Sequence, residues 1–184
     1  MIKGLLIALA AAAGLFCVVG VLLPPGYDII RSREIKAHPI KVYLWVGELR
    51  SWPQWWPWTD LGPAAKFSFG PKTSGVGSTA GLQGRPGAAK VTVTEASPTG
   101  GIAFDYSFDS GAGQGRCSME TRVSGEVTNL TWRCQGRFAT PVLGGYLAAL
   151  ADPMHGGMLD WGLKRLKDLV EADKREVFGD PASP

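Results

Sequence analysis

Residues 116–135 read RCSMETRVSGEVTNLTWRCQ, and this stretch predicts a β-hairpin. A turn over residues 124–127 joins its two arms and fixes the register of every residue behind it. Apolar residues meet apolar residues in that register, which supports the pairing. The opposed pairs are Val123 with Thr128, Thr121 with Leu130, Met119 with Trp132, and Cys117 with Cys134.

Cys117 and Cys134 fall directly opposite each other in this register. Opposed Cβ atoms at a non-hydrogen-bonded position are close enough for a disulfide, which forms in exported proteins and rarely in the reducing cytosol. Two small buried thiols without a bond fit the sequence at least as well. The sequence leaves both interpretations open.

Apolar and polar residues also alternate upstream of the hairpin, between Gly-rich turns. In residues 101–108 the large apolar side chains share one face, whereas Asp105 and Ser107 share the other. This pattern is typical of an antiparallel sheet with one covered face and one wet face. The expected strands are residues 27–35, 64–69, 77–83, 88–97, 101–108, 116–123 and 130–135.

Two helices are expected around these strands. Residues 40–49 form the first, which a run of Trp and Pro residues over 52–58 breaks into a tight turn. The second covers residues 142–173, where leucine and valine recur at three-to-four spacing. Pro153 and the glycine pair 156–157 are expected to bend or interrupt its first part.

Residues 4–23 form an uncharged run rich in Leu, Ala and Val, long enough as a helix to cross about 30 Å of hydrocarbon. We interpret this run as a transmembrane anchor. The alternative is a cleaved signal peptide, because Lys3 gives a basic start and residues 11–13 are alanines. Cleavage there would leave apolar residues 15–23 on the mature protein, which argues against it. The flanking charges leave open which side of the membrane the domain occupies.

The expected organisation is a transmembrane anchor over residues 1–24, one domain over 25–178 and a flexible tail over 179–184. Of the 184 residues, 45% are hydrophobic and 19% are charged, which suits a strand-and-turn domain. The net charge of +3 is scattered, without the basic stripe that follows a phosphate backbone. Nucleic acid is therefore not an expected partner, and the oligomeric state stays open.

The most specific motifs are RSREI at 31–35 with AHP at 37–39, WPQWWPW at 52–58, GPKTSGVGS at 70–78 and GLKRLK at 162–167. With these motifs the chain resembles the SRPBCC superfamily of START-like helix-grip proteins. It is most similar to the bacterial polyketide cyclase/dehydrase-like branch with an N-terminal membrane segment.

This resemblance implies an α+β helix-grip fold preceded by a transmembrane helix. In such a fold, a curved antiparallel sheet of about seven strands wraps around a long C-terminal helix, with a hydrophobic cavity between them. Residues 80–84 depart from the family pattern, which bears on the shape of that cavity.

Reactive arrangements are scarce in the sequence. His38 and His155 lie far apart and Cys17 falls in the anchor, so we expect no metal site and no cofactor. If the protein is an enzyme, its acid or base is one of Glu95, Tyr106 and His155.

Large apolar side chains on the inward faces are the expected ligand contacts. A sheet that curls around one helix leaves space that the helix does not fill, unless large side chains occupy it. Core packing alone also accounts for each of these residues. The set comprises Phe104, Tyr106, Phe108, Met119, Trp132, Met154, Met158 and Trp161.

Three functions are compatible with these features. The leading expectation is a membrane-tethered binding protein for a hydrophobic small molecule, such as a lipid-like, quinone or aromatic compound. The first alternative is a cyclase/dehydratase-like enzyme. The second is a non-catalytic interaction module whose cavity is closed by its own side chains.

Overall fold

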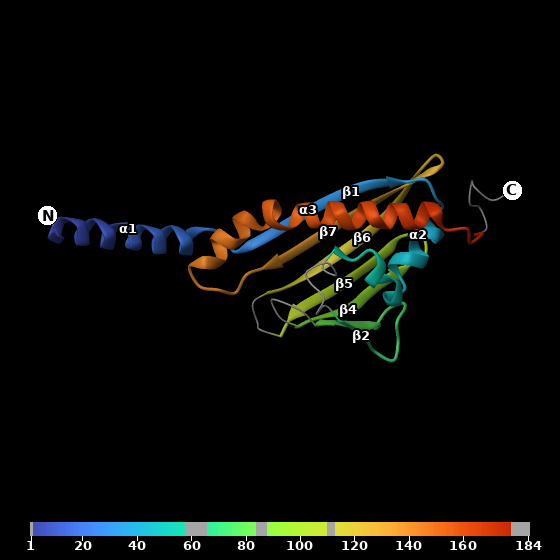
Figure 1. Ribbon diagram of the computed structural model, residues 1–184, viewed down its shortest axis with the longest axis horizontal. Coiled ribbons are helices and arrows are strands. Elements are labelled where there is room, and N and C mark those ends of the chain that lie inside the picture. Colours follow the sequence, from blue (N-terminus) through green and yellow to red (C-terminus); the bar gives the residue numbers. More distant parts are fainter. Residues whose placement is uncertain (1, 58–65, 84–87, 110–112, 178–184) are drawn as a thin grey trace.

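Seven antiparallel strands form one sheet in the computed structural model, which describes residues 2–57, 66–83, 88–109 and 113–177. Their spatial order is β1-β7-β6-β5-β4-β3-β2, so the first strand lies beside the last (Figure 1). The strands are β1 (Gly26–Ile35), β2 (Lys66–Phe69), β3 (Thr79–Gln83), β4 (Ala88–Ser97), β5 (Gly101–Phe108), β6 (Gln114–Ser124) and β7 (Val127–Arg137).

The β6–β7 hairpin has the register that the sequence predicts. Cys117 lies opposite Cys134, and the ladder continues to the pair Ser124 and Val127. Gly125 adopts the positive φ of 62° that the tight turn requires. The structure contains a disulfide between Cys117 and Cys134, whose Cα atoms lie 4.1 Å apart.

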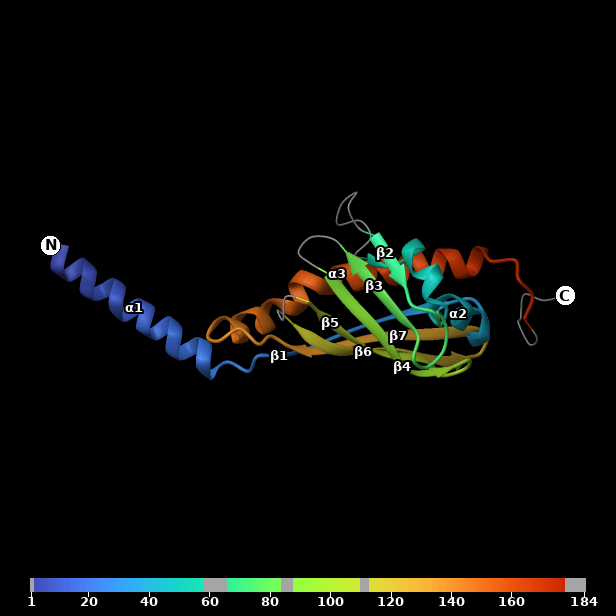
Figure 2. The same cartoon turned by 90° about the horizontal axis from the view of Figure 1, so that it is seen from below.

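One long helix, α3 (Leu143–Ala172), lies along β1 on the inner face of the sheet (Figures 1 and 2). It is continuous through Pro153 but changes direction in its first part (Figure 1). The sheet with this helix confirms the α+β helix-grip fold. The buried stripe of α3 comprises Leu159, Leu163, Leu166 and Val170, as their spacing predicts.

The helix predicted over residues 40–49 is split into two. The first part, α2 (Pro39–Val46), begins after His38, whose Nδ1 accepts a hydrogen bond from the Ile40 amide at 3.4 Å. A 3-10 helix, η1 (Leu49–Gln54), follows it. The break therefore comes just before the Trp and Pro run, a few residues earlier than predicted.

Three tryptophans at the end of this segment fill one end of the inner face. Trp52 stacks on Trp56 with ring centroids 4.3 Å apart, and Trp55 meets Trp132 edge-on at 5.8 Å. Phe104 packs against Trp52 at 5.1 Å. Aromatic pairs at such separations contribute about 0.5–1.5 kcal/mol each beyond the area they bury. The cluster fixes η1 on the sheet.

The N-terminal helix α1 (Ile2–Leu22) projects from the domain (Figures 1 and 2). Its described residues are exposed except Gly20, which is buried where α1 meets the start of α3. The helix is therefore not part of the domain core. Its 21 residues are long and apolar enough to cross a membrane.

The remaining strand predictions are recovered within a few residues of their ends, and strands 88–97 and 101–108 have the predicted limits. Three predicted features lie outside the described residues. They are Trp58, the first residues of the strand over 64–69, and the tail over 179–184.

Candidate ligand-binding face

One row of residues crosses the whole inner face of the sheet. Each member pairs with the next on the neighbouring strand, so the row follows from the strand registers. The row consists of Phe69, Ala80, Val91, Tyr106, Gly115, Gly136 and Tyr27. Two phenol hydroxyls are its only polar side-chain groups.

The two tyrosines of this row meet over its two glycines. The hydroxyls of Tyr27 and Tyr106 are hydrogen-bonded to each other. A Cβ atom would lie 2.6 Å from the Tyr106 hydroxyl if placed on Gly115, and 2.7 Å from it if placed on Gly136. Because neither glycine has a side chain, phenols from β1 and β5 can meet across the two strands between them.

This phenol pair can donate a hydrogen bond but cannot act as a base near neutral pH. Burial raises the pKa of the Tyr27 phenol, whose ordinary value is about 10. Each hydroxyl carries one hydrogen, so the bond between Tyr27 and Tyr106 uses one and leaves the other free to donate. The pair therefore offers one O–H donor to a polar group of a ligand.

Apolar side chains around this pair are only half-buried. The long helix runs along β1 (Figure 2), and η1 with Trp52, Trp55 and Trp56 covers one end of the inner face. Large apolar side chains that stay accessible on such a face offer contact area to an apolar ligand. The half-buried set comprises Tyr27, Phe67, Phe69, Leu82, Tyr106, Phe108 and Phe138.

Phe104, Met119 and Trp132 point inward, as expected for ligand contacts. Protein atoms cover them, leaving at most 1% of each residue exposed. They form the closed end of the inner face together with the tryptophans that follow α2. Of the predicted strand contacts, Tyr106 and Phe108 lie in the accessible part.

The expectation that Met154 and Trp161 face inward is wrong. They are 57% and 37% exposed, whereas Met158 is half-buried. Their positions on α3 lie away from the stripe that begins at Leu159. Because the sequence also allowed an interruption at Pro153, it did not fix the rotation of the first part of the helix, which carries Met154. Trp161 lies two residues after Leu159, so the helical spacing of the buried stripe itself turns Trp161 away from the sheet.

Glu95 does not lie on the inner face. A β-bulge after Val93 shifts the pairing from Val93–Phe104 to Glu95–Ala103, which breaks the alternation that would turn Glu95 inward. Its carboxylate instead pairs with Arg116 on the outer face, and its side chain is 73% exposed. Glu95 is therefore excluded as a buried acid.

His155 lies on α3 and is half-buried. Its Nδ1 is buried and has no hydrogen-bond partner among the described residues. Burial lowers the pKa of the imidazole, so His155 is neutral at physiological pH. Within the described part of the chain, no three His, Cys, Asp or Glu side chains come together as a metal site.

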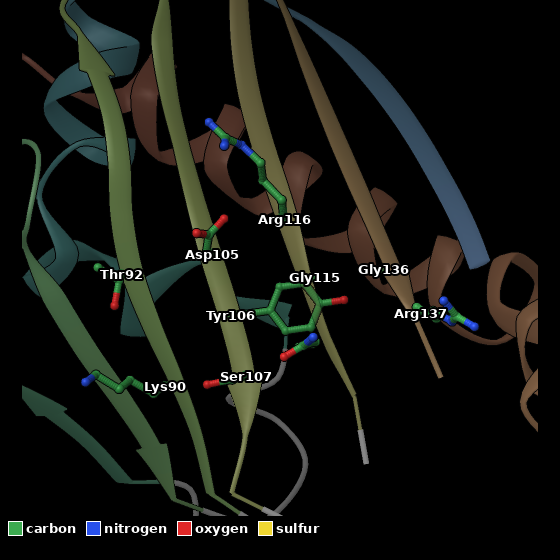
Figure 3. A pocket seen from close by; sticks show the side chains of 10 residues that line it. Lys90, Thr92, Asp105, Tyr106, Ser107, Gly115, Arg116, Gly136 and Arg137 are labelled. Atoms are coloured by element: carbon green, nitrogen blue, oxygen red, sulfur yellow. The ribbon is translucent and has the colours of Figure 1, made fainter. Parts of the chain in front are cut away.

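A polar groove of about 580 Å³ lies on the opposite, outer face of the sheet. Figure 3 shows its lining residues on β4, β5, β6 and β7, with α3 behind the strands. Most of its lining residues carry charged, amide or hydroxyl side chains, so it suits an apolar ligand less well than the inner face does. Its lining is Lys90, Thr92, Asp105, Tyr106, Ser107, Gln114, Gly115, Arg116, Gly136 and Arg137.

Sequence reasoning missed Tyr27 as the partner of Tyr106. A turn fixes the register of β6 and β7, but β1 joins β7 from the far end of the chain, and no local signal sets that register. The glycines at 115 and 136 were a usable signal, because the hairpin register already placed them opposite each other.

The family comparison agrees with this architecture. The sequence profile of the family described as polyketide cyclase/dehydrase and lipid transport matches residues 28–171. The chain belongs to this family. The match runs from Asp28 in β1 to Glu171 near the end of α3, so it includes the half-buried aromatic face except Tyr27, which lies one residue before it. No curated protein matches the chain in sequence.

Solved structures share the fold at low sequence identity. An uncharacterized protein from Rhizobium leguminosarum has a TM-score of 0.62 and 15% identity, over 80% of this chain and 96% of that chain. A protein from Thermus thermophilus has a TM-score of 0.57 and 15% identity, over 80% and 99%. The Aha1 dimer from Colwellia psychrerythraea has a TM-score of 0.53 and 18% identity, over 80% and 98%. At these levels of identity, the similarities show a shared fold and nothing about function.

Proposed function

We propose that this chain is a membrane-tethered binding protein for a hydrophobic small molecule that carries a hydrogen-bond acceptor. The half-buried aromatic face around the Tyr27–Tyr106 pair carries the proposal. The family description, which includes lipid transport, agrees with a hydrophobic ligand.

The phenol pair narrows the class of ligand. It offers one O–H donor within apolar surroundings, and a donor left without an acceptor there costs free energy. A carbonyl oxygen is a fitting acceptor. Lipid-like esters, quinones and polyketide ketones all combine such an oxygen with a large apolar body.

Tethering is supported by the exposed apolar helix α1. Its 21 residues would span about 32 Å, close to the thickness of a bilayer's hydrocarbon core. The start of α3 contacts both Phe16 and Gly20 of α1, which links α1 to the folded domain. Such contacts favour a retained anchor over a cleaved signal peptide.

The disulfide between Cys117 and Cys134 supports placing the domain on the outer side of the membrane. Such bonds persist in oxidising compartments and are rare in the cytosol. We therefore propose that α1 holds the domain outside the reducing cytosol.

Native mass spectrometry of the detergent-extracted full chain tests the binding function. We expect an added mass from a co-purified lipid, quinone or polyketide, and exchange of that mass for added decylubiquinone. A bare chain that takes up neither decylubiquinone nor a palmitoyl ester would contradict the proposal.

An acid–base enzyme is the second candidate, and His155 favours it. Its buried Nδ1 lacks a partner among the described residues, and its lowered pKa keeps the imidazole neutral and able to accept a proton. With Glu95 on the outer face, His155 is left as the candidate base and Tyr106 as the candidate acid. If His155→Ala and Tyr106→Phe leave the turnover of an identified substrate unchanged, this candidate is excluded.

A further inference from the structure

A line of exposed apolar side chains runs along the first part of α3. Leu143, Leu150, Met154 and Trp161 are between 37% and 57% exposed. They are spaced seven, four and seven residues apart, which places them in one narrow strip of a helix with 3.6 residues per turn. We call these four residues the apolar strip.

The strip stops where charged side chains begin on the same face of α3. Beyond Trp161 the same face carries Arg165, whose guanidinium lies 5.0 Å from the Trp161 ring, and then Asp168. Asp168 is 59% exposed and pairs with Lys164 at 3.1 Å. A solvated helix face normally carries such charges along its whole length, so the apolar part indicates a second environment.

The strip begins where α3 is packed on α1. The Tyr146 ring stacks on Phe16 with centroids 4.5 Å apart, and its hydroxyl donates a hydrogen bond to the Phe16 carbonyl at 2.9 Å. A Cβ atom on Gly20 would lie 2.8 Å from the Tyr146 ring, so only a glycine allows this approach. The start of α3 is thereby fixed beside the last two turns of α1.

These contacts set the depth of α3 relative to a bilayer. Phe16 lies six residues before Leu22, the end of α1, which is about 9 Å along the helix axis. If α1 spans the hydrocarbon, Tyr146, which contacts both Phe16 and Gly20, lies about 3–9 Å inside the hydrocarbon edge, in the upper acyl region next to the interface where tyrosine is enriched. In Figure 2, α1 inclines toward the side of the sheet that carries α3. The strip, on the side of α3 away from the sheet, therefore faces the bilayer.

We infer that the apolar strip lies in the lipid headgroup and upper acyl region, so that α3 rests on the membrane surface as an interfacial helix. This inference rests on the proposed anchoring by α1. It places one side of α3 against the lipid from which an apolar ligand would enter or leave.

Spin-label accessibility of the full chain in liposomes of phosphatidylcholine and phosphatidylglycerol tests this inference. Nitroxides are attached singly at Leu9→Cys in α1, Met154→Cys in the strip and Asp168→Cys on the charged part, each in a Cys17→Ala background. We expect position 154 to resemble position 9, with collision with oxygen exceeding collision with a water-soluble nickel complex. Position 168 is expected to show the reverse.

The three positions separate the possible failures. An aqueous signal at 154 with a lipid signal at 9 would overturn the interfacial helix and leave the anchoring intact. Aqueous signals at both 9 and 154 would overturn the anchoring and this inference together. Dipolar broadening at 154, with exclusion of both collision partners, would assign the strip to a second copy of the chain and also overturn the inference.

Discussion

Arg31 of β1 lies directly over Gly156 of α3, in the space that a side chain at position 156 would occupy. A Cβ atom there would be 2.7 Å from the guanidinium carbon of Arg31. From this position Arg31 reaches Asp152 at 2.7 Å and Asp160 at 2.9 Å, one turn to either side of the glycine. These two ion pairs connect the first part of α3 to β1 of the sheet.

Gly156→Ala should therefore destabilise the protein although alanine is the better helix former. We expect displacement of Arg31 to lower the unfolding free energy by about 1–2 kcal/mol. Gly157→Ala is the matched control, because a Cβ atom there meets nothing within 4 Å. It should raise the unfolding free energy by about 0.5–1 kcal/mol. Urea denaturation in detergent measures both, and equal effects of the two substitutions would contradict the contact.

Loss of the disulfide should destabilise the hairpin. We expect joint replacement of Cys117 and Cys134 by alanine to cost about 2–4 kcal/mol of unfolding free energy, since the bond restricts the unfolded chain. Intact mass before and after reduction should differ by two hydrogen atoms. A free-thiol mass in protein purified without reductant would contradict the bond and the outward placement of the domain.

His155 should make the protein less stable in mild acid. Its folded pKa is lowered by burial, so the unfolded chain takes up a proton first as the pH falls below about 6.5. The unfolding free energy should therefore fall with pH below that value and level off once the folded form is protonated. Denaturation near pH 7.5 and pH 5 measures the effect. The account is wrong if His155→Gln leaves the same pH dependence as the parent chain.

Joint replacement of Tyr27 and Tyr106 by phenylalanine should weaken ligands that carry a carbonyl oxygen and spare those that do not. It keeps both rings and removes both hydroxyls, so that no O–H donor is left for the carbonyl. We expect binding of decylubiquinone to weaken by about tenfold, equivalent to about 1.4 kcal/mol. Decylbenzene, which lacks the carbonyl, should bind unchanged. A loss of equal size for both compounds would show that the hydroxyls support packing and do not recognise the ligand.

The sequence predicted the structure correctly where a turn or a periodic pattern within one segment determined the geometry. The turn after Ser124 fixed the pairing of Cys117 with Cys134, and alternation placed Phe104 on the inner face. Apolar spacing located the buried stripe of α3. The order of the strands and the large core residues follow from such local patterns, whereas the helix-grip fold was implied by the family resemblance.

The candidate face was harder to predict, because its details depend on contacts between distant segments. The bulge after Val93 turns Glu95 outward, and no residue pattern in the sequence predicts this bulge. The register of β1 against β7 brings Tyr27 to Tyr106, which lie 79 residues apart in the chain. The rotation of the first part of α3, which exposes Met154, depends on its packing against α1 and Arg31.

We propose that an apolar molecule binds to the inner face of the sheet. Phe67 and Ser68 are neighbours on β2 with opposite orientations, the first half-buried and the second exposed. Each can be changed to aspartate, which adds the same charge to the same strand on opposite faces.

The most direct test is the quenching of tryptophan fluorescence by decylubiquinone in the full chain and these two variants. We predict that Phe67→Asp weakens binding by at least about tenfold, because a carboxylate disfavours an apolar ligand there. Ser68→Asp should bind like the parent chain. Equal binding by all three proteins, or a loss confined to Ser68→Asp, would contradict ligand binding at the inner face.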